Sequence, residues 1–446
     1  MSDPNPDDKL HISRRTLLTA SGAGISLAVA GCLGDDQDDG EPAEPTDDDE
    51  ATEDDQTDTT EDEEEDEEQE EEVLPDPTET DSALIEPETL QEWQEAGLVN
   101  KENPGESARV VVLRAWDTTE YEDGHVPGAV PWAVENFHAE RLEGLAHSAP
   151  MVATGDQVDT VLDQAGVCPR TTIVISGPSA LRSARAYWTL RYWGFPRERL
   201  KVLNGGYHAY GQEYDLEEGR FNPMEIPNAN YSVQAHEELN NGLRLGIAQM
   251  IQRVDLINAG ERDDVILENR APEPDTVIQS ATWDDPANYH EGDSYNTRYE
   301  EGGRWKQPDE VESYVAGELG VDSDDTVATY CGSGYRAAMS FFALDGILGY
   351  DDVTVYDGSF SRQWNQYAGD EVPDEWRVDM HGRTDGEVEA VDIDIAVDEI
   401  PDLETAEANQ VEAADMNYMA GGEAGEGDGG EGGDWGCDSV GVAIGD

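Results

Sequence analysis

A cysteine followed by small residues and an arginine is the clearest candidate for covalent chemistry in this chain. The segment consists of Cys331, Gly332, Ser333, Gly334, Tyr335 and Arg336, between a short β-rich run and a helical pattern of apolar residues. Small residues let successive backbone N–H groups turn inward, and such a nest at the start of a helix favours an anion. It would therefore stabilise a thiolate, which is the nucleophilic form of cysteine. The pattern predicts that Cys331 attacks a small anionic molecule and that the other five residues bind it.

The elements that must position this loop occur twice in the chain. Residues 172–184 align with residues 326–338, and each segment reads as a strand, a loop of small residues, an arginine and a helix. Each helix is followed by a second strand and a turn, and the repeat is long enough to be a duplicated domain. Gly177 stands where the second copy has Cys331, so the first copy has no nucleophile at this position.

The order of strands and helices favours one fold class. A strand–helix–strand unit predicts a parallel sheet with helices on both faces. Residues 110–113 and 265–267 are further apolar runs typical of buried strands. In the first copy, residues 121–129 form a turn-rich link to the next strand, whereas residues 275–281 of the second copy keep strand-forming residues with different turn chemistry. We expect an α/β protein with two such domains, flanked by disordered acidic segments.

The charge balance restricts the partners. The 446 residues include 26 Lys and Arg against 103 Asp and Glu, a net charge of −77. Nucleic acid is excluded as a partner, because binding phosphates requires clustered basic side chains. Mean hydropathy is −0.68, which excludes a polytopic membrane protein. Because the acidic residues also run through the segments that look folded, we expect a halophilic protein whose stability rises with salt.

The ends of the chain read as targeting and solvated segments. Arg14 and Arg15 precede a short apolar run that ends in Val29, Ala30, Gly31 and Cys32. This order is typical of a Tat-type signal with a lipidated Cys32, which would export the protein and anchor it by lipid on the outer face of the membrane. The alternative is a cytoplasmic N-terminal helix with an incidental arginine pair. The expected organisation is a signal at 1–32, an acidic tether at 33–78, domains at 79–228 and 229–380, and an acidic Gly-rich tail at 381–446.

Three motifs carry a resemblance to a known family. Residues 124–129, residues 331–336, and residues 356–359 with Trp364 together resemble the rhodanese family, in particular the tandem thiosulfate and 3-mercaptopyruvate sulfurtransferases. The resemblance covers about residues 80–378. It implies an inactive first copy and a catalytic second copy, in which Cys331 carries a persulfide between a small anionic sulfur donor and a thiol or cyanide acceptor. No metal or organic cofactor is expected.

Several side chains have two interpretations. Arg270, in Glu268-Asn269-Arg270, resembles an arginine of the family that binds substrate, but it can equally be structural. The family's next arginine has no counterpart here. Arg336 can contact the donor or brace the loop, and an arginine at the matching position of the first copy, Arg182, favours bracing. His125 is expected to brace a turn, and Asp357 and Ser359 to shape the turn beside the active loop.

The function also has alternatives. The favoured interpretation is a sulfurtransferase that uses thiosulfate or a mercaptopyruvate-like donor. A non-catalytic rhodanese-like binding or sensing lipoprotein is the second, and a phosphatase is the third, although the related phosphatases have a loop one residue longer. Two cysteines remain outside this chemistry: Cys168 is expected to be a packing or surface residue, and Cys437 lies in the tail, from which it could act as an acceptor.

Overall fold

The computed structural model describes residues 74–104, 108–117, 120–391, 393–400 and 409–422. All of them belong to one compact unit, Glu71–Asp446. The expected signal with Cys32, most of the acidic tether, and Cys437 lie outside the described residues. Within the described part of the chain, no helix is long and apolar enough to span a membrane.

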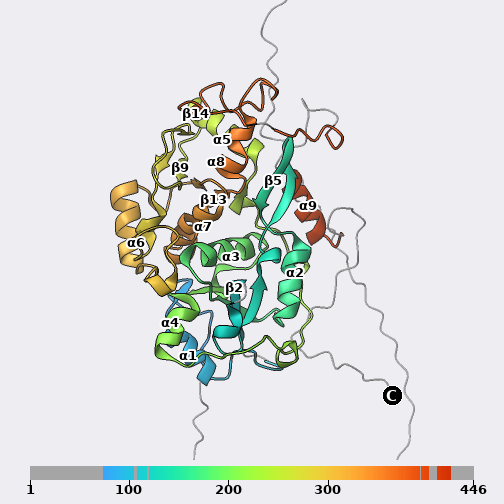
Figure 1. The fold of residues 1–446 in the computed structure, drawn as a ribbon, viewed down its shortest axis with the longest axis vertical. Coiled ribbons are helices and arrows are strands. Elements are labelled where there is room, and N and C mark those ends of the chain that lie inside the picture. Colours follow the sequence, from blue (N-terminus) through green and yellow to red (C-terminus); the bar gives the residue numbers. More distant parts are fainter. Residues whose placement is uncertain (1–73, 105–107, 118–119, 392, 401–408, 423–446) are drawn as a thin grey trace, which may run out of the picture. The chain divides into compact units, whose positions relative to one another are not determined.

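The first sheet, which contains β2 (Figure 1), has five parallel strands in the order β1–β7–β6–β2–β3. The strands are β1 (Leu84–Ile85), β2 (Arg109–Asp117), β3 (Val130–Ala133), β6 (Thr171–Ile175) and β7 (Leu200–Leu203). The helices of this copy are α1 (Pro87–Glu95), α2 (Gly155–Gln164), α3 (Ala180–Tyr192) and α4 (Gly206–Glu213). Every residue of β6 is buried, as expected for a central strand of a parallel sheet covered on both faces.

The second sheet repeats this arrangement. Its five parallel strands run β8–β13–β12–β9–β11, the same order with the matching strands in the same places. They are β8 (Arg244–Leu245), β9 (Val265–Glu268), β11 (Thr282–Trp283), β12 (Val327–Tyr330) and β13 (Val353–Tyr356). Its helices are α5 (Ile247–Asn258), α6 (Pro308–Tyr314) with the π-turn η9 (Val315–Leu319), α7 (Tyr335–Phe341) with the π-turn η10 (Phe342–Ile347), and α8 (Ser359–Arg362). The duplicated topology confirms the predicted pair of α/β domains.

Two small antiparallel pairs lie outside the main sheets. They are β4 (Ala139–Glu143) with β5 (Ala146–Met151), and β10 (Val277–Ile278) with β14 (Thr384–Asp385). The 3₁₀ turns are η1 (Tyr121–Asp123), η2 (Val134–Asn136), η3 (Arg197–Arg199), η4 (Pro223–Glu225), η5 (Val233–Ala235), η6 (Asn241–Leu243), η7 (Pro286–Tyr289), η8 (Tyr299–Glu301) and η11 (Trp364–Tyr367). Within residues 275–281, strand β10 therefore pairs with β14 rather than with the main sheet. The edge strand that completes the second sheet is β11, which follows this segment.

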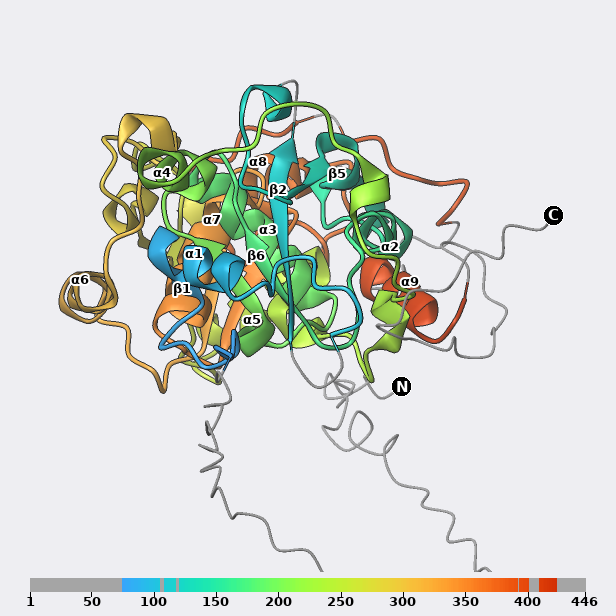
Figure 2. The same cartoon turned by 90° about the horizontal axis from the view of Figure 1, so that it is seen from below.

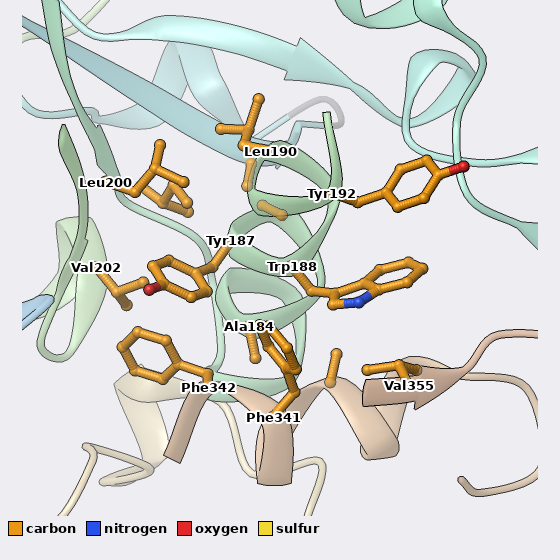
Figure 3. Close-up of a cluster of buried hydrophobic side chains, with 14 of the residues drawn as sticks. Ala184, Tyr187, Trp188, Leu190, Tyr192, Leu200, Val202, Phe341, Phe342 and Val355 are labelled. Atoms are coloured by element: carbon orange, nitrogen blue, oxygen red, sulfur yellow. The ribbon is translucent and has the colours of Figure 1, made fainter. Parts of the chain in front are cut away.

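One apolar core joins the two copies. Helix α3 of the first copy packs on α7 of the second, and Figure 3 shows Tyr187 and Trp188 of α3 beside Phe341 and Phe342. The rings of Tyr187 and Phe342 meet edge to face, with centroids 4.8 Å apart. Because these large side chains are fully buried between the sheets, the two copies share a rigid interface.

Part of the C-terminal region is folded, which corrects the expectation that the acidic tail at 381–446 is disordered. Helix α9 (Gln410–Met419) packs beside α2 and β4 of the first copy (Figure 2). Asp415 is 2% exposed and accepts hydrogen bonds from Arg141 and from the Tyr192 hydroxyl at 2.8 Å. The acidic composition misled here, because one carboxylate of the segment points inward to a buried arginine.

Two further residues have a clear structural place. His125 is buried and its Nδ1 lies 2.9 Å from the carbonyl oxygen of Tyr121, so it braces its turn as expected. Cys168 is buried, but it is disulfide-bonded rather than a free packing residue. Cys331 is the only free cysteine among the residues that the structure describes.

Candidate active site

Cys331 lies at the carboxyl end of β12, the central strand of the second sheet. Its neighbours in the sheet, β9 and β13, end at the same edge. The loop that follows runs directly into α7 at Tyr335. Cys331 is 1% exposed, so only a small molecule that enters the loop can reach its sulfur.

The loop needs its glycine and turns an amide toward the sulfur. The backbone N–H of Ser333 donates to Sγ of Cys331 at 3.4 Å. Gly334 has φ of +79°, and a Cβ there would lie 2.8 Å from the Asp357 carbonyl oxygen and 2.9 Å from Nη1 of Arg185. A larger residue at 334 would therefore push the loop away from both groups.

Ser359 fixes the backbone on the other side of the cysteine. Its Oγ accepts the N–H of Cys331 at 3.2 Å and donates to the carbonyl oxygen of Tyr356 at 2.9 Å. Ser359 has φ of +55°, a strained conformation for a residue other than glycine. The carbonyl oxygen of Cys331 also accepts the N–H of Phe360 at 2.8 Å. Ser359 therefore shapes the turn beside the loop, as predicted, and it also positions the backbone of the cysteine.

Asp357 joins this turn to the first copy, a role that the sequence did not reveal. It is fully buried and pairs with Arg185 of α3 at 2.9 Å and with Arg244 of β8 at 3.2 Å. The N–H of Val152 donates to it at 2.8 Å. Burial raises the pKa of Asp357, but Arg185 and Arg244 outweigh that effect and hold its pKa below the ordinary value. The carboxylate is thus a charged connection between the copies.

Side chains of the first copy face Tyr335 of the loop. The Tyr335 hydroxyl lies 2.9 Å from Nδ1 of His138. Burial, together with Arg185 and Arg182, lowers the pKa of His138. Arg182 lies 5.0 Å from the centre of the Tyr335 ring.

The side chains of Trp116, His138 and Arg182 form a wall of the site that the sequence does not reveal. They precede the loop by roughly 150 to 220 residues, about the length of a whole domain. Arg182 does not support the bracing interpretation of Arg336, because it lies over Trp116 and near the other copy's loop. The available signal was the duplication itself, since matching loops of two packed copies can face each other.

The two arginines predicted to bind substrate are placed differently. Arg336 lies beside the loop: its Nη1 donates to the carbonyl oxygen of Ala271 at 3.2 Å and its guanidinium stands 4.5 Å from the centre of the Tyr295 ring. Arg270 pairs with the buried Glu268 at 2.7 Å and lies over the ring of Phe360. Arg270 thus has the bracing geometry of its structural interpretation, while Arg336 has no carboxylate partner among the described residues.

Comparison with known proteins agrees with these motifs. A family model described as rhodanese-like domain matches residues 95–213, within the first copy. A protein of Haloferax volcanii with the provisional name thiosulfate sulfurtransferase is 24% identical over 285 residues, which are 62% of this chain and 93% of that protein. A protein of Saccharopolyspora erythraea with the same provisional name is 26% identical over 267 residues, 56% of this chain and 84% of that protein.

Among solved structures, SseA from Escherichia coli, described with the 3-mercaptopyruvate sulfotransferases, aligns with a TM-score of 0.46 and 20% identity over 63% of this chain and 100% of that chain. The family model covers the first copy, and the second copy repeats its strand order and carries the cysteine loop. The chain therefore contains a rhodanese-like domain in its first copy, and its second copy repeats the strand order of that domain.

Proposed function

We propose that the protein is a sulfurtransferase in which Cys331 takes sulfane sulfur from thiosulfate and passes it to a thiophilic acceptor. One observation carries the proposal. The free cysteine lies at the strand end with an amide of its own loop directed at Sγ, while the matching residue of the first copy is Gly177. The names of the relatives from Haloferax volcanii and Saccharopolyspora erythraea support the same activity.

The reaction balances without a redox cofactor. The Cys331 thiol first loses its proton to solvent, and the thiolate attacks the outer sulfur of thiosulfate. A new S–S bond forms, the bond between the two sulfurs of thiosulfate breaks, and its electron pair leaves with sulfite. Cyanide then attacks the outer sulfur of the persulfide, forming thiocyanate and returning the cysteine thiolate. The Ser333 N–H, at 3.4 Å from Sγ, is the group that would stabilise the sulfur anion in both steps.

The donor preference follows from the surroundings of the loop. Tyr335 of the loop has Arg182 and Trp116 near its ring, and a cation beside the loop suits a small oxyanion. Thiosulfate is the preferred donor and a mercaptopyruvate-like thiol acid is the second candidate, since both end in an oxyanion and carry one transferable sulfur. Cys331 is 1% exposed, which disfavours bulky donors.

A cyanolysis assay tests the proposal. The full chain should form thiocyanate from thiosulfate and cyanide, and Cys331→Ala should not. A chain that forms no thiocyanate with either donor, although folded, would favour the binding or sensing alternative. Hydrolysis of a generic aryl phosphate with no sulfur transfer would favour the phosphatase alternative.

We also propose that the protein is exported and held on the outer membrane face through a lipid on Cys32. The support is the sequence order Arg14, Arg15, apolar run and Ala30-Gly31-Cys32. Cys32→Ser should move the protein from the membrane fraction to the soluble fraction or leave an uncut precursor. Unchanged membrane partitioning of the variant would overturn this part of the proposal.

A further inference from the structure

Arg182 is a cation of the first copy that lies against the active loop of the second. It is the third residue of α3, and its guanidinium carbon is 3.5 Å from the centre of the Trp116 ring and 5.0 Å from that of Tyr335. Tyr335 belongs to the Cys331 loop, and Arg185, one turn along α3, approaches Gly334 of the same loop. The face of α3 that carries Arg182 is therefore the face that covers the loop.

Arg182 has no carboxylate partner among the described residues. This is unusual in a chain with 103 acidic and 26 basic residues, in which nearby arginines of α3 are paired: Arg185 with Asp357 and Arg191 with Asp345. Arg182 is half-buried, and burial lowers its pKa. A partly desolvated cation gains from an anionic ligand, because part of the cost of removing its water is already incurred.

The residue under Arg182 is held in a strained conformation. Trp116 has φ of +59° and lies at a bulge in β2, where the pairing with β3 shifts between Ala115 and Asp117. A bulge re-aims a side chain, and strained residues collect at functional sites. Here the bulge presents the indole as a platform that fixes the guanidinium, while the ring also meets Tyr335 edge to face at 6.0 Å.

Of the two arginines of the second copy near the loop, Arg336 donates to the carbonyl oxygen of Ala271, and Arg270 is not free for the same task. Arg270 is occupied by Glu268, and the family's next arginine has no counterpart in this sequence. We propose that Arg182 binds the oxyanion end of the sulfur donor. The first copy, which has no cysteine in its own loop, would then supply a cation that determines donor specificity at the Cys331 loop of the second copy. This inference rests on the proposed function. The ligand chemistry is a small oxyanion, either the sulfonate-like end of thiosulfate or a carboxylate.

The test separates donor binding from the chemistry of Cys331. Persulfide formation is followed in single-turnover reactions at increasing thiosulfate, and discharge of the persulfide by dithiothreitol is followed separately. The variants are Arg182→Gln and Arg182→Lys, with Arg199→Gln as the matched control. Arg199 is also a half-buried arginine of the first copy without a carboxylate hydrogen bond, and it lies at the opposite end of the strand–helix unit.

We expect Arg182→Gln to raise the half-saturating thiosulfate concentration about tenfold or more, the effect of losing one charge-assisted contact. Arg182→Lys should recover part of that loss, discharge by the neutral thiol should be unchanged, and Arg199→Gln should match the parent. The same titration with mercaptopyruvate distinguishes the two oxyanions. Only for the true donor should the half-saturating concentration be higher in Arg182→Gln than in the parent.

The outcomes are separable. A parent protein that never forms a persulfide overturns the proposed function itself. If the parent forms a persulfide and Arg182→Gln shows the same dependence on thiosulfate concentration, only the role of Arg182 is overturned. Thiosulfate binding to Cys331→Ser, measured by calorimetry with and without Arg182→Gln, gives the same decision without turnover: equal affinities would contradict the inference.

Discussion

The matching loops of the two copies, one at Gly177 and one at Cys331, differ in their contacts. In the first copy, the Pro178 carbonyl oxygen accepts the N–H of Tyr299 at 3.0 Å, so the second copy binds the loop through its backbone. A Cβ at Gly177 would lie 2.6 Å from Oγ of Ser183, which leaves little room for a side chain. In the second copy, the loop holds a free cysteine and faces aromatic and cationic side chains. One loop of the duplicated pair is bound by the backbone of the other copy, and the other loop holds the free cysteine to which we assign the chemistry.

The turns behind the two loops differ in the same way. Asn204 of the first copy is neutral: its Oδ1 accepts the N–H of Trp305 at 2.9 Å, and its amide donates to Glu86 at 2.9 Å. The matching Asp357 is a buried carboxylate between two arginines. At the first loop, the connection to the other copy is a hydrogen bond from the Trp305 N–H to the neutral Asn204, whereas at the Cys331 loop it is an ion pair between Asp357 and Arg185.

The largest expected effect is on the nucleophile. Cys331→Ser should reduce sulfur transfer on the order of 10³-fold or more, because a serine hydroxyl does not attack sulfane sulfur at neutral pH. Adding Gly177→Cys should not restore it, since Ser183 crowds that position and the second copy binds the loop. Thiocyanate formation measures both variants. Rescue by the second change would show that the first loop remains competent.

The next effect concerns the buried charge. Asp357→Asn leaves Arg185 and Arg244 without their carboxylate and should lower the free energy of unfolding by about 3–5 kcal/mol. The reverse change, Asn204→Asp, places a carboxylate beside Glu86 and should cost less, about 1–3 kcal/mol. Urea unfolding measures both. Equal losses would contradict the distinction between a charged and a neutral connection.

The same carboxylate predicts a dependence on acid. The pKa of Asp357 in the folded protein is below its ordinary value of 3.8, so its contribution to stability is complete above pH 3.8 and is lost as the pH falls through the lower folded pKa. The free energy of unfolding of Asp357→Asn should therefore fall less steeply below pH 3.8 than that of the parent. Parallel curves would show that Asp357 is not charged in the fold.

The smallest expected effect distinguishes strain from hydrogen bonding at Ser359. Ser359→Ala keeps the strained φ of +55° but loses the bond to the N–H of Cys331, whereas Ser359→Gly loses the bond and relieves the strain. Both should slow persulfide formation, and the glycine variant should be the more stable by about 1 kcal/mol. The first copy provides the precedent, with Gly206 at φ of +56° in the matching position. A glycine variant with the parent's rate would remove the positioning role of the hydroxyl.

Local patterns were sufficient for the fold and the loop, because both depend on residues close together in sequence. The apolar runs at β2, β6, β9 and β12 and the loop from Cys331 to Arg336 were readable for this reason. The wall formed by Trp116, His138 and Arg182 was not, because it arises where two copies pack. The inward carboxylate Asp415 was hidden for a different reason: composition averages over a segment and does not show which acidic residue is buried.

The measurement that tests the central claim most directly is intact-mass analysis of the chain after incubation with thiosulfate and removal of the donor. The account predicts a gain of one sulfur atom on the parent, located by peptide mapping on Cys331, and no gain on Cys331→Ser. A sulfur found on Cys331→Ser, or on a peptide that lacks residue 331, would contradict the assignment of the nucleophile.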